Sequence, residues 1–378
     1  MKITTISNVA GCGWAGSEEL WLAAAMEALW SGHSVTACIN KELYSAAPLK
    51  AFVSQGGNLI DWTRFPISRF EQAKQALFPQ FTLARLGYPD VLLVSLGALP
   101  AMNYVPGLVN FLLKTTQPFV ILCQFNTDSL GIAPHERESV RHVLERASSV
   151  VFVSEQNRVL ARRQYRLELP NSHVIYNPIR IHLESPLPYN GIESEVVFAC
   201  VARFETLWKG QDLLIEILAS DVWKSRKWKL KFFGEGPDLQ HVRNYTKMLG
   251  LQERVTFEGY VRDVRQIWSD SHLMILPSRG EGTPLAILEA MMCGRPVVTT
   301  DAGGNLEVLE EGVTGWIADA ATARSFALAL ERAWVNKSRW AEMGQVAHAK
   351  AIQLAEQEPS LNLLQVLIQS TKAASSLG

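Results

Sequence analysis

Short, continuously apolar runs alternate along this chain with longer amphipathic segments, and this alternation limits the folds that the chain can adopt. Residues 91–97 read VLLVSLG, residues 119–125 read FVILCQF and residues 272–278 read HLMILPS. A strand that is apolar throughout is covered on both faces, which is typical of a parallel sheet between layers of helices. The alternation therefore predicts an α/β protein assembled from βαβ units.

The length and one irregular stretch predict two domains. The 378 residues exceed what one hydrophobic core commonly holds. Residues 178–194 are rich in proline, lack helical periodicity and separate two series of apolar runs. We expect an N-terminal domain over residues 1–178 and a C-terminal domain over residues 179–359, each a doubly wound parallel sheet. We expect a last helix, at about residues 360–378, to pack back onto the first domain.

Composition and charge argue against several classes of protein. The formal net charge of −1 gives no basic surplus for binding nucleic acid, so we expect no nucleic-acid partner. The five cysteines include no C-x-x-C pair, which indicates buried thiols in a reducing, cytoplasmic location. No signal peptide and no run of about 18 apolar residues is found, so any membrane contact is expected to be peripheral.

A glycine loop near the N-terminus resembles a dinucleotide-binding fingerprint. Residues 11–16 read GCGWAG, a G-x-G-x-x-G pattern before a helical segment. However, the first glycine follows the apolar run late, and no acidic residue closes the second run, SVTACINK. We therefore disfavour a dehydrogenase. A turn without a ligand stays an alternative to our interpretation, in which Gly16 brings backbone N–H groups to a large ligand.

Two carboxylates lie in the segment LPSRGEGTPLAILEAMMCGRPVV, residues 276–298. On one helix, eight residues would advance by about 800°, or about 80° net, so Glu281 and Glu289 would face the same cleft. The N–H groups of Gly282, Thr283 and Leu285 would be exposed at the helix start, where an anion or sugar hydroxyls can bind. This segment is our principal candidate for a ligand site.

A pair of cations follows the first apolar run of the second domain. In the segment ARFETLWKG, Arg203 and Lys209 are six residues apart, in the loop where a parallel strand would end. A guanidinium and a mobile ammonium group suit a diphosphate. The pair therefore predicts an anion site beside the Glu281 segment.

These motifs resemble the retaining glycosyltransferases of family 4. The matching segments, over nearly the whole chain, are ARFETLWKG, FFGEGPDLQ, VTFEGYV, the Glu281 to Glu289 spacing, EAMMCGRPVV and DAGGNLEVLEEGVTGW. The resemblance implies the GT-B fold, in which two Rossmann-like domains face each other across a cleft. It also implies that a nucleotide-diphosphate sugar is the co-substrate, that no other cofactor is needed, and that a carbohydrate or lipid-linked acceptor receives the sugar.

The resemblance assigns roles to residues. Arg203 and Lys209 would hold the diphosphate, and Glu281 would contact the donor sugar with the N–H groups of Gly282 and Thr283. Glu289 would bind the ribose, and the backbone at Tyr260 and Val261 would meet the base. Gly16 would approach the diphosphate, and Trp14, inside the glycine loop, would stack against the acceptor. Where many members have a histidine, the candidate sugar or acceptor contacts are Gln124, Asn126 and Asp128, with capping of the next helix as the alternative.

The expected reaction is a metal-independent, retaining transfer in bacterial polysaccharide or envelope glycan synthesis. The chain contains no D-x-D motif, and the two cations can stabilise the departing diphosphate. The paired carboxylates also allow a glycosidase, although Glu289 is better placed for ribose. A nucleotide-sugar epimerase or phosphorylase, or a catalytically silent binding subunit, remains open. Basic stretches at residues 61–88 and 158–166 are candidates for binding anionic lipid or acidic saccharide, with a solvated helix face as the alternative.

Overall fold

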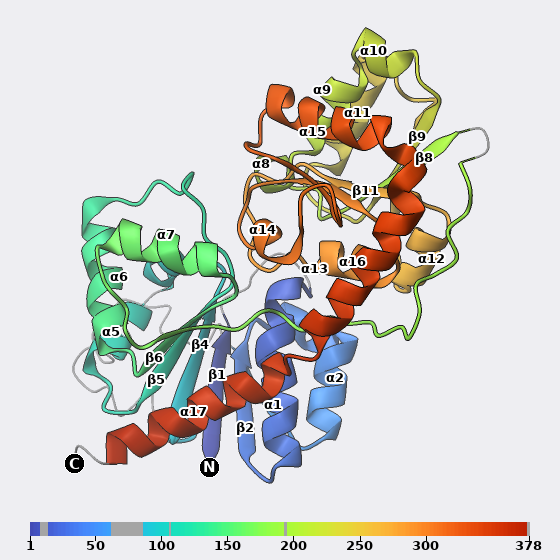
Figure 1. Cartoon of the computed structure of the whole chain (residues 1–378). Helices are drawn as coiled ribbons and strands as arrows, with labels where there is room; N and C mark the ends of the chain where they lie inside the picture. Colours follow the sequence, from blue (N-terminus) through green and yellow to red (C-terminus); the bar gives the residue numbers. More distant parts are fainter. Residues whose placement is uncertain (8–13, 62–85, 106, 193–194, 376–378) are drawn as a thin grey trace. The chain divides into compact units, whose positions relative to one another are not determined.

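The chain folds into two compact units (Figure 1). The structure is a computed structural model that describes all residues except 8–13, 62–85, 106, 193–194 and 376–378. Unit 1 comprises Met1–Pro178 and Glu358–Gly378, and unit 2 comprises Ile179–Gln357. The basic stretch at residues 61–88 lies almost wholly outside the described residues, as do Gly11, Cys12 and Gly13 of the glycine loop.

Unit 1 is built on a seven-stranded parallel sheet in the order β3-β2-β1-β4-β5-β6-β7. Its strands are β1 (Lys2–Ser7), β2 (Ser34–Ile39), β3 (Asn58–Asp61), β4 (Val91–Leu96), β5 (Phe119–Cys123), β6 (Ser149–Phe152) and β7 (Ser172–Val174). Its described helices are η1 (Gly16–Glu18), α1 (Glu19–Trp30), η2 (Lys41–Ser45), α2 (Ala47–Ser54), η4 (Leu99–Tyr104), α5 (Leu108–Lys114), α6 (Pro134–Arg146), α7 (Glu155–Tyr165) and α17 (Pro359–Ser375).

Helices cover both faces of this sheet, as its apolar strands require. On one face, Trp21 of α1 and Leu363 of α17 pack against strand residues. On the other face, Phe111 of α5 and Val143 of α6 fill a second buried cluster. Figure 1 shows α17 crossing beside α1, so the last helix of the chain packs on unit 1.

Unit 2 is built on a six-stranded parallel sheet in the order β10-β9-β8-β11-β12-β13. Its strands are β8 (Val196–Val201), β9 (Trp228–Phe233), β10 (Val255–Gly259), β11 (Leu273–Leu276), β12 (Val297–Thr300) and β13 (Gly315–Ala318). Its helices are α8 (Thr206–Lys209), α9 (Gln211–Leu218), α10 (Asp221–Lys224), α11 (Leu239–Met248), α12 (Val264–Ser269), α13 (Leu285–Met292), α14 (Asn305–Val308), α15 (Ala323–Val335), η5 (Lys337–Arg339) and α16 (Trp340–Ala355).

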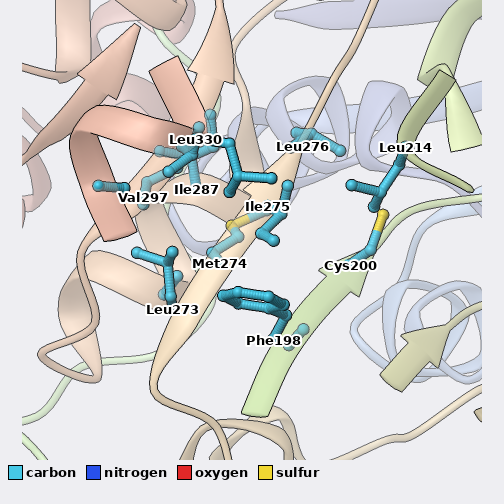
Figure 2. Packing of buried hydrophobic residues seen from close by; sticks show 14 of the residues in the cluster. Phe198, Cys200, Leu214, Leu273, Met274, Ile275, Leu276, Ile287, Val297 and Leu330 are labelled. Carbon is cyan, nitrogen blue, oxygen red and sulfur yellow. The ribbon is translucent and has the colours of Figure 1, made fainter. Parts of the chain in front are cut away.

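One apolar cluster joins the sheet of unit 2 to its helices. Figure 2 shows Met274 and Ile275 of β11 between Phe198 of β8 and Ile287 of α13. The irregular segment after residue 178 is fixed to this unit by Arg295, whose guanidinium donates to the carbonyl oxygens of Leu187 and Pro188 at 3.2 and 2.7 Å. The segment that separates the two series of strands is therefore partly ordered by contacts with unit 2.

The cysteine thiols in the described part of the chain are buried and reduced. Cys38 and Cys123 lie in the sheet of unit 1, Cys200 lies in β8, and Cys293 ends α13. These four are the buried thiols that the sequence predicts.

The strand orders locate the favoured ligand position in each unit. In each sheet the order reverses beside the first strand, between β1 and β4 in unit 1 and between β8 and β11 in unit 2. Ligands of doubly wound sheets bind outside the carboxyl ends of strands at such a switch point. The loops after β1, β8 and β11 are therefore where a site is expected.

Candidate active site

The loops after β8 and β11 bring a lysine and a glutamate together. Lys209 Nζ lies 2.7 Å from Glu281 Oε1, and Ser278 Oγ donates to the same oxygen at 2.6 Å. The Glu281 side chain is only 7% exposed, and that of Lys209 is 25% exposed. An opposite charge and a hydroxyl thus stabilise a nearly buried carboxylate, as a buried charge requires.

A glycine permits this approach. Gly210 follows α8 with a left-handed φ of +65°, and a Cβ there would lie 2.2 Å from the carbonyl oxygen of Pro277. Only glycine combines this backbone conformation with so close an approach to the end of β11. Gly210 therefore allows the preceding residue, Lys209, to lie close to the loop that carries Glu281.

Arg203 is also held by local contacts. Its Nε donates to Glu205 Oε1 at 2.7 Å, and Gln211 Nε2 donates to its carbonyl oxygen at 2.8 Å. The guanidinium is about a third exposed, so part of it faces solvent. The two cations that the sequence pairs for a diphosphate thus have different acidic partners in the ligand-free protein, Glu205 for Arg203 and Glu281 for Lys209.

The helical interpretation of the Glu281 segment is wrong in its first half. Helix α13 begins only at Leu285, so Glu281 precedes the helix and the angular argument for the two carboxylates does not apply. The backbone of Glu281 lies against Gly303, where a Cβ would be 2.1 Å from the Glu281 carbonyl oxygen. Gly304 N also donates a hydrogen bond to the Gly282 carbonyl at 2.9 Å. The loop packs on the segment after β12.

The N–H group of Leu285 is not exposed, contrary to the sequence prediction. It donates to the Thr283 carbonyl at 3.0 Å across Pro284, whose φ and ψ of −81° and 81° are those of an inverse γ-turn. The turn satisfies this donor before the helix begins. Gly282 and Thr283 remain the backbone candidates of this loop, and the Thr283 side chain is buried.

The remaining candidates of unit 2 for binding the nucleotide are a second glutamate and a short loop. Glu289 lies in α13 and is buried. Val261 follows β10 and packs partly against the core, whereas the Tyr260 side chain is 69% exposed. Gly259, with a φ of +72°, turns the chain at the end of β10. Tyr260 and Val261 therefore lie at the carboxyl edge of the unit 2 sheet, like the residues after β8 and β11.

In unit 1, the described part of the glycine loop is tied to the start of α1. Gly16 begins η1, and the Trp14 indole N–H donates to a Glu19 carboxylate oxygen. The Trp14 and Trp21 rings lie with their centroids 6.3 Å apart. Trp14 is thus partly buried against unit 1, which leaves only part of its ring for the acceptor contact that the sequence predicts.

The sequence analysis missed a buried carboxylate beside this loop. Glu18 is fully buried and accepts hydrogen bonds from Ser7 Oγ at 3.0 Å and Trp21 Nε1 at 2.8 Å. Burial raises the pKa of Glu18 to about 7, and the two hydrogen bonds only partly oppose that shift. No motif marked Glu18, because its burial depends on β1 and α1 packing together.

The three candidates after β5 differ in their contacts. Gln124 is 4% exposed, and neither its Oε1 nor its Nε2 has a hydrogen-bond partner among the described residues. Asn126 Oδ1 accepts from Thr127 N at 3.0 Å, and exposed Asp128 pairs with Arg163. None of the three caps the next helix, because the N-cap of α6 is Ala133. Gln124 is therefore the one of the three whose buried polar atoms call for a further partner.

A comparison with protein families assigns the second unit. Residues 195–336 match the family described as Glycosyl transferases group 1, and this segment contains Arg203, Lys209, Glu281 and Glu289. This segment, called the group 1 domain after the matching family, makes up less than half of the chain. It includes all six strands of unit 2.

Two curated bacterial proteins are similar to part of this chain. N-acetyl-alpha-D-glucosaminyl L-malate synthase of Bacillus anthracis is 30% identical over 199 residues, which are 50% of this chain and 51% of that protein. The lipopolysaccharide 1,6-galactosyltransferase of Salmonella typhimurium is 27% identical over 147 residues, 38% of this chain and 40% of that protein. The chain thus aligns with about half or less of the length of these relatives.

Solved structures extend the likeness beyond the group 1 domain to the whole chain. HepE of Anabaena in complex with UDP has a TM-score of 0.71 and 19% identity, with 100% of both chains covered. The lipopolysaccharide outer core galactosyltransferase WaaB has a TM-score of 0.69 and 18% identity, with 98% of this chain and 99% of that chain covered. The chain therefore has the GT-B fold that the resemblance implies.

No described helix is long and apolar enough to cross a membrane. Within the same residues, no group of three or more His, Cys, Asp or Glu side chains is arranged to hold a metal ion.

Proposed function

We propose that the chain transfers a sugar from a nucleoside diphosphate sugar to a carbohydrate or lipid-linked acceptor in bacterial polysaccharide or envelope glycan synthesis. The observation that carries this proposal is the Lys209–Glu281 pair at the switch point of the unit 2 sheet, within the group 1 domain. Lys209 and Arg203 offer positive charge for a diphosphate, and Glu281 offers acceptor oxygens for sugar hydroxyls. Because HepE was solved with UDP, we take a uridine nucleotide as the first candidate.

The proposed chemistry keeps the anomeric configuration and uses no metal. The bond between the anomeric carbon and the phosphate oxygen breaks, and the acceptor oxygen forms a bond on the same face of the sugar. The acceptor proton passes to the leaving phosphate. The charge that develops on the diphosphate is stabilised by Arg203 and Lys209, and preorganised cations of this kind stabilise a transition state more than a ground state.

The residues of the site divide between binding and chemistry. Glu281, Gly282 and Thr283 would hold the donor sugar, Glu289 the ribose and Val261 the base. Gln124, Trp14 and Gly16 are the candidates of unit 1 for the sugar, acceptor and diphosphate. We propose a cytoplasmic location, where the reduced state of the buried thiols persists, with peripheral membrane contact through the basic residues of α7.

The test is a transfer assay with UDP-sugars and candidate oligosaccharide or lipid-linked acceptors. We expect UDP to be released only when acceptor is present, activity to survive a chelator, and the product to keep the donor's anomeric configuration. Release without acceptor would favour a phosphorylase or epimerase, and an inverted product would contradict the retaining step. Glu281→Gln should remove turnover more than UDP binding; unchanged turnover would contradict the role of Glu281.

A further inference from the structure

The loop that carries Glu281 also carries Arg279, whose side chain and main chain make hydrogen bonds around the Lys209–Glu281 pair. The Arg279 guanidinium donates to both carboxylate oxygens of Asp212, at 2.9 and 3.0 Å, and its Nη1 also donates to the Thr206 carbonyl. In addition, its main-chain N–H donates to the Trp208 carbonyl at 2.7 Å. One residue thus binds α8 through two carbonyl groups and α9 through a carboxylate.

These contacts connect the three segments on which the position of Lys209 depends. Lys209 is the last residue of α8, Asp212 lies in the first turn of α9, and Glu281 follows Arg279 by two residues. Because α8 is a single turn of four residues, it has no stability of its own and takes its orientation from such contacts.

The start of α8 has a separate anchor. Thr206 N and Oγ1 both donate to Asp238 Oδ2, at 2.7 and 2.8 Å. Asp238 therefore holds the beginning of α8, and Arg279 holds the carbonyl side of the turn that ends in Lys209. Besides Arg279, the Lys209–Glu281 pair and a hydrogen bond from Gly280 N to the Trp208 carbonyl at 3.4 Å connect α8 to the β11 loop.

We propose that Arg279, paired with Asp212, is a positioning residue that holds α8 so that the Lys209 ammonium group reaches Glu281. Arg279 does not itself serve the diphosphate, because its guanidinium is bound to a carboxylate in bidentate geometry and to a backbone carbonyl. These contacts support the placement of Lys209 whether or not the chain transfers a sugar. Its consequence for catalysis rests on the proposed function.

The first test needs no nucleotide. Reductive methylation of lysines, followed by mass spectrometry of the peptide that contains Lys209, measures how accessible and how strongly paired its amine is. We expect Arg279→Met to raise the methylation rate of Lys209 by about fivefold, the loss expected when a bidentate ion pair that orders a short segment is removed. An unchanged rate in folded Arg279→Met protein overturns the proposal.

Unit 2 offers a matched control. Arg226 makes a bidentate pair with Glu331, with both Nη–Oε distances at 2.7 Å, and packs over the rings of Trp223 and Trp334. Arg226→Met thus removes an equivalent pair and should lower thermal stability at least as much as Arg279→Met. It should leave the methylation of Lys209 unchanged; an equal rise in both variants would mean that the effect is general loosening, and would overturn the proposal.

Milder variants keep the test decisive where Arg279→Met does not fold. Asp212→Asn keeps the shape of the side chain and removes its charge, so it should also raise the methylation rate of Lys209. Arg279→Lys keeps the charge but loses the bidentate geometry, so its rate of Lys209 methylation should lie between those of the wild type and Arg279→Met. The double variant Arg279→Met, Asp212→Asn should match the more affected single variant, because the two residues act through one contact.

A second measurement separates this proposal from the proposed function. Calorimetric titration with UDP and with uridine compares a ligand that has the diphosphate with one that lacks it. We expect Arg279→Met to weaken UDP about tenfold and uridine little, whereas Arg226→Met weakens neither selectively. If no variant binds UDP while Lys209 methylation behaves as expected, the proposed uridine specificity fails and the positioning role stands. If UDP and uridine weaken equally in Arg279→Met, the catalytic consequence is wrong.

Discussion

Lys209 and Glu281 form an ion pair across 72 residues of sequence, with Nζ and Oε1 2.7 Å apart. One partner follows β8 and the other follows β11, so the pair spans the switch point of the unit 2 sheet. In the proposed reaction the two groups serve different parts of the donor, Lys209 the diphosphate and Glu281 the sugar. A donor that binds both side chains must replace the Lys209–Glu281 ion pair with its own contacts to them. Binding of the diphosphate is therefore coupled to binding of the sugar.

This coupling predicts strongly non-additive effects in a double-mutant cycle. Lys209→Met should lower kcat/KM by about 10² to 10³, the range for removing one preorganised charge donor. Glu281→Gln should lower it comparably, and the double variant should be little worse than the more damaged single variant, because each single change breaks the same ion pair. Steady-state kinetics with one UDP-sugar and one acceptor measures all four forms. Additive losses would show that the two groups act independently.

A second prediction concerns the glycine that follows Lys209. Gly210→Ala should lower the free energy of unfolding by about 3 kcal/mol or more, because the left-handed φ and a Cβ 2.2 Å from the Pro277 carbonyl oxygen both oppose a side chain. Chemical denaturation measures the change.

Gly250 provides the control for that variant. It has a similar φ of +73°, but a Cβ there meets no atom within 4 Å. Gly250→Ala should therefore lose only about 1 kcal/mol, the cost of the backbone conformation. Equal losses in the two variants would show that the approach to Pro277 contributes nothing.

The sheets and the main charged residues could be predicted because they depend on local patterns. Continuous apolar runs mark buried parallel strands, and the cations and carboxylates lie in the loops that follow them. The contact between Lys209 and Glu281 could not be deduced from spacing, since it depends on the strand order that places β8 beside β11. The resemblance to known transferases assigns both residues to the same donor molecule, and so it predicts that they are close together.

Two predictions at the Glu281 loop failed for a local reason. Helix α13 begins directly after Pro284, but the sequence does not show whether the residues before that proline are helical. The inverse γ-turn at Pro284 separates Glu281 from α13 and satisfies the Leu285 N–H group. Glu18 and Arg279 were missed because a carboxylate or a guanidinium is unremarkable in sequence until its partners, Ser7 and Asp212, are brought to it by packing.

A third prediction follows from the buried amide of Gln124. Its side-chain atoms lack partners among the described residues, so replacing them with an apolar group of similar size removes an unsatisfied polar group. Gln124→Met should raise the free energy of unfolding by about 1 kcal/mol and lower transfer activity, if the amide binds a sugar hydroxyl. Denaturation and the transfer assay are measured on the same protein.

The control for Gln124 is Gln164, in the same unit. Its Nε2 donates to the Thr127 carbonyl at 3.0 Å, so Gln164→Met breaks an existing hydrogen bond and should lower stability without changing turnover. A Gln124→Met variant with full activity would remove Gln124 from the proposed sugar contacts.

The fourth prediction is a pH dependence of stability due to Glu18, whose pKa is raised from 4.5 to about 7 in the folded protein by burial. Between these values the folded chain binds a proton that the unfolded chain has released. The free energy of unfolding therefore falls as pH rises through this window, by up to about 3 kcal/mol in total.

Glu18→Gln cannot ionise, so its free energy of unfolding should fall less between about pH 5 and about pH 8. Urea denaturation at both pH values measures the difference, with exposed Glu42→Gln as the control that keeps the wild-type slope. An identical slope in Glu18→Gln would show that the buried carboxyl group does not titrate in this range.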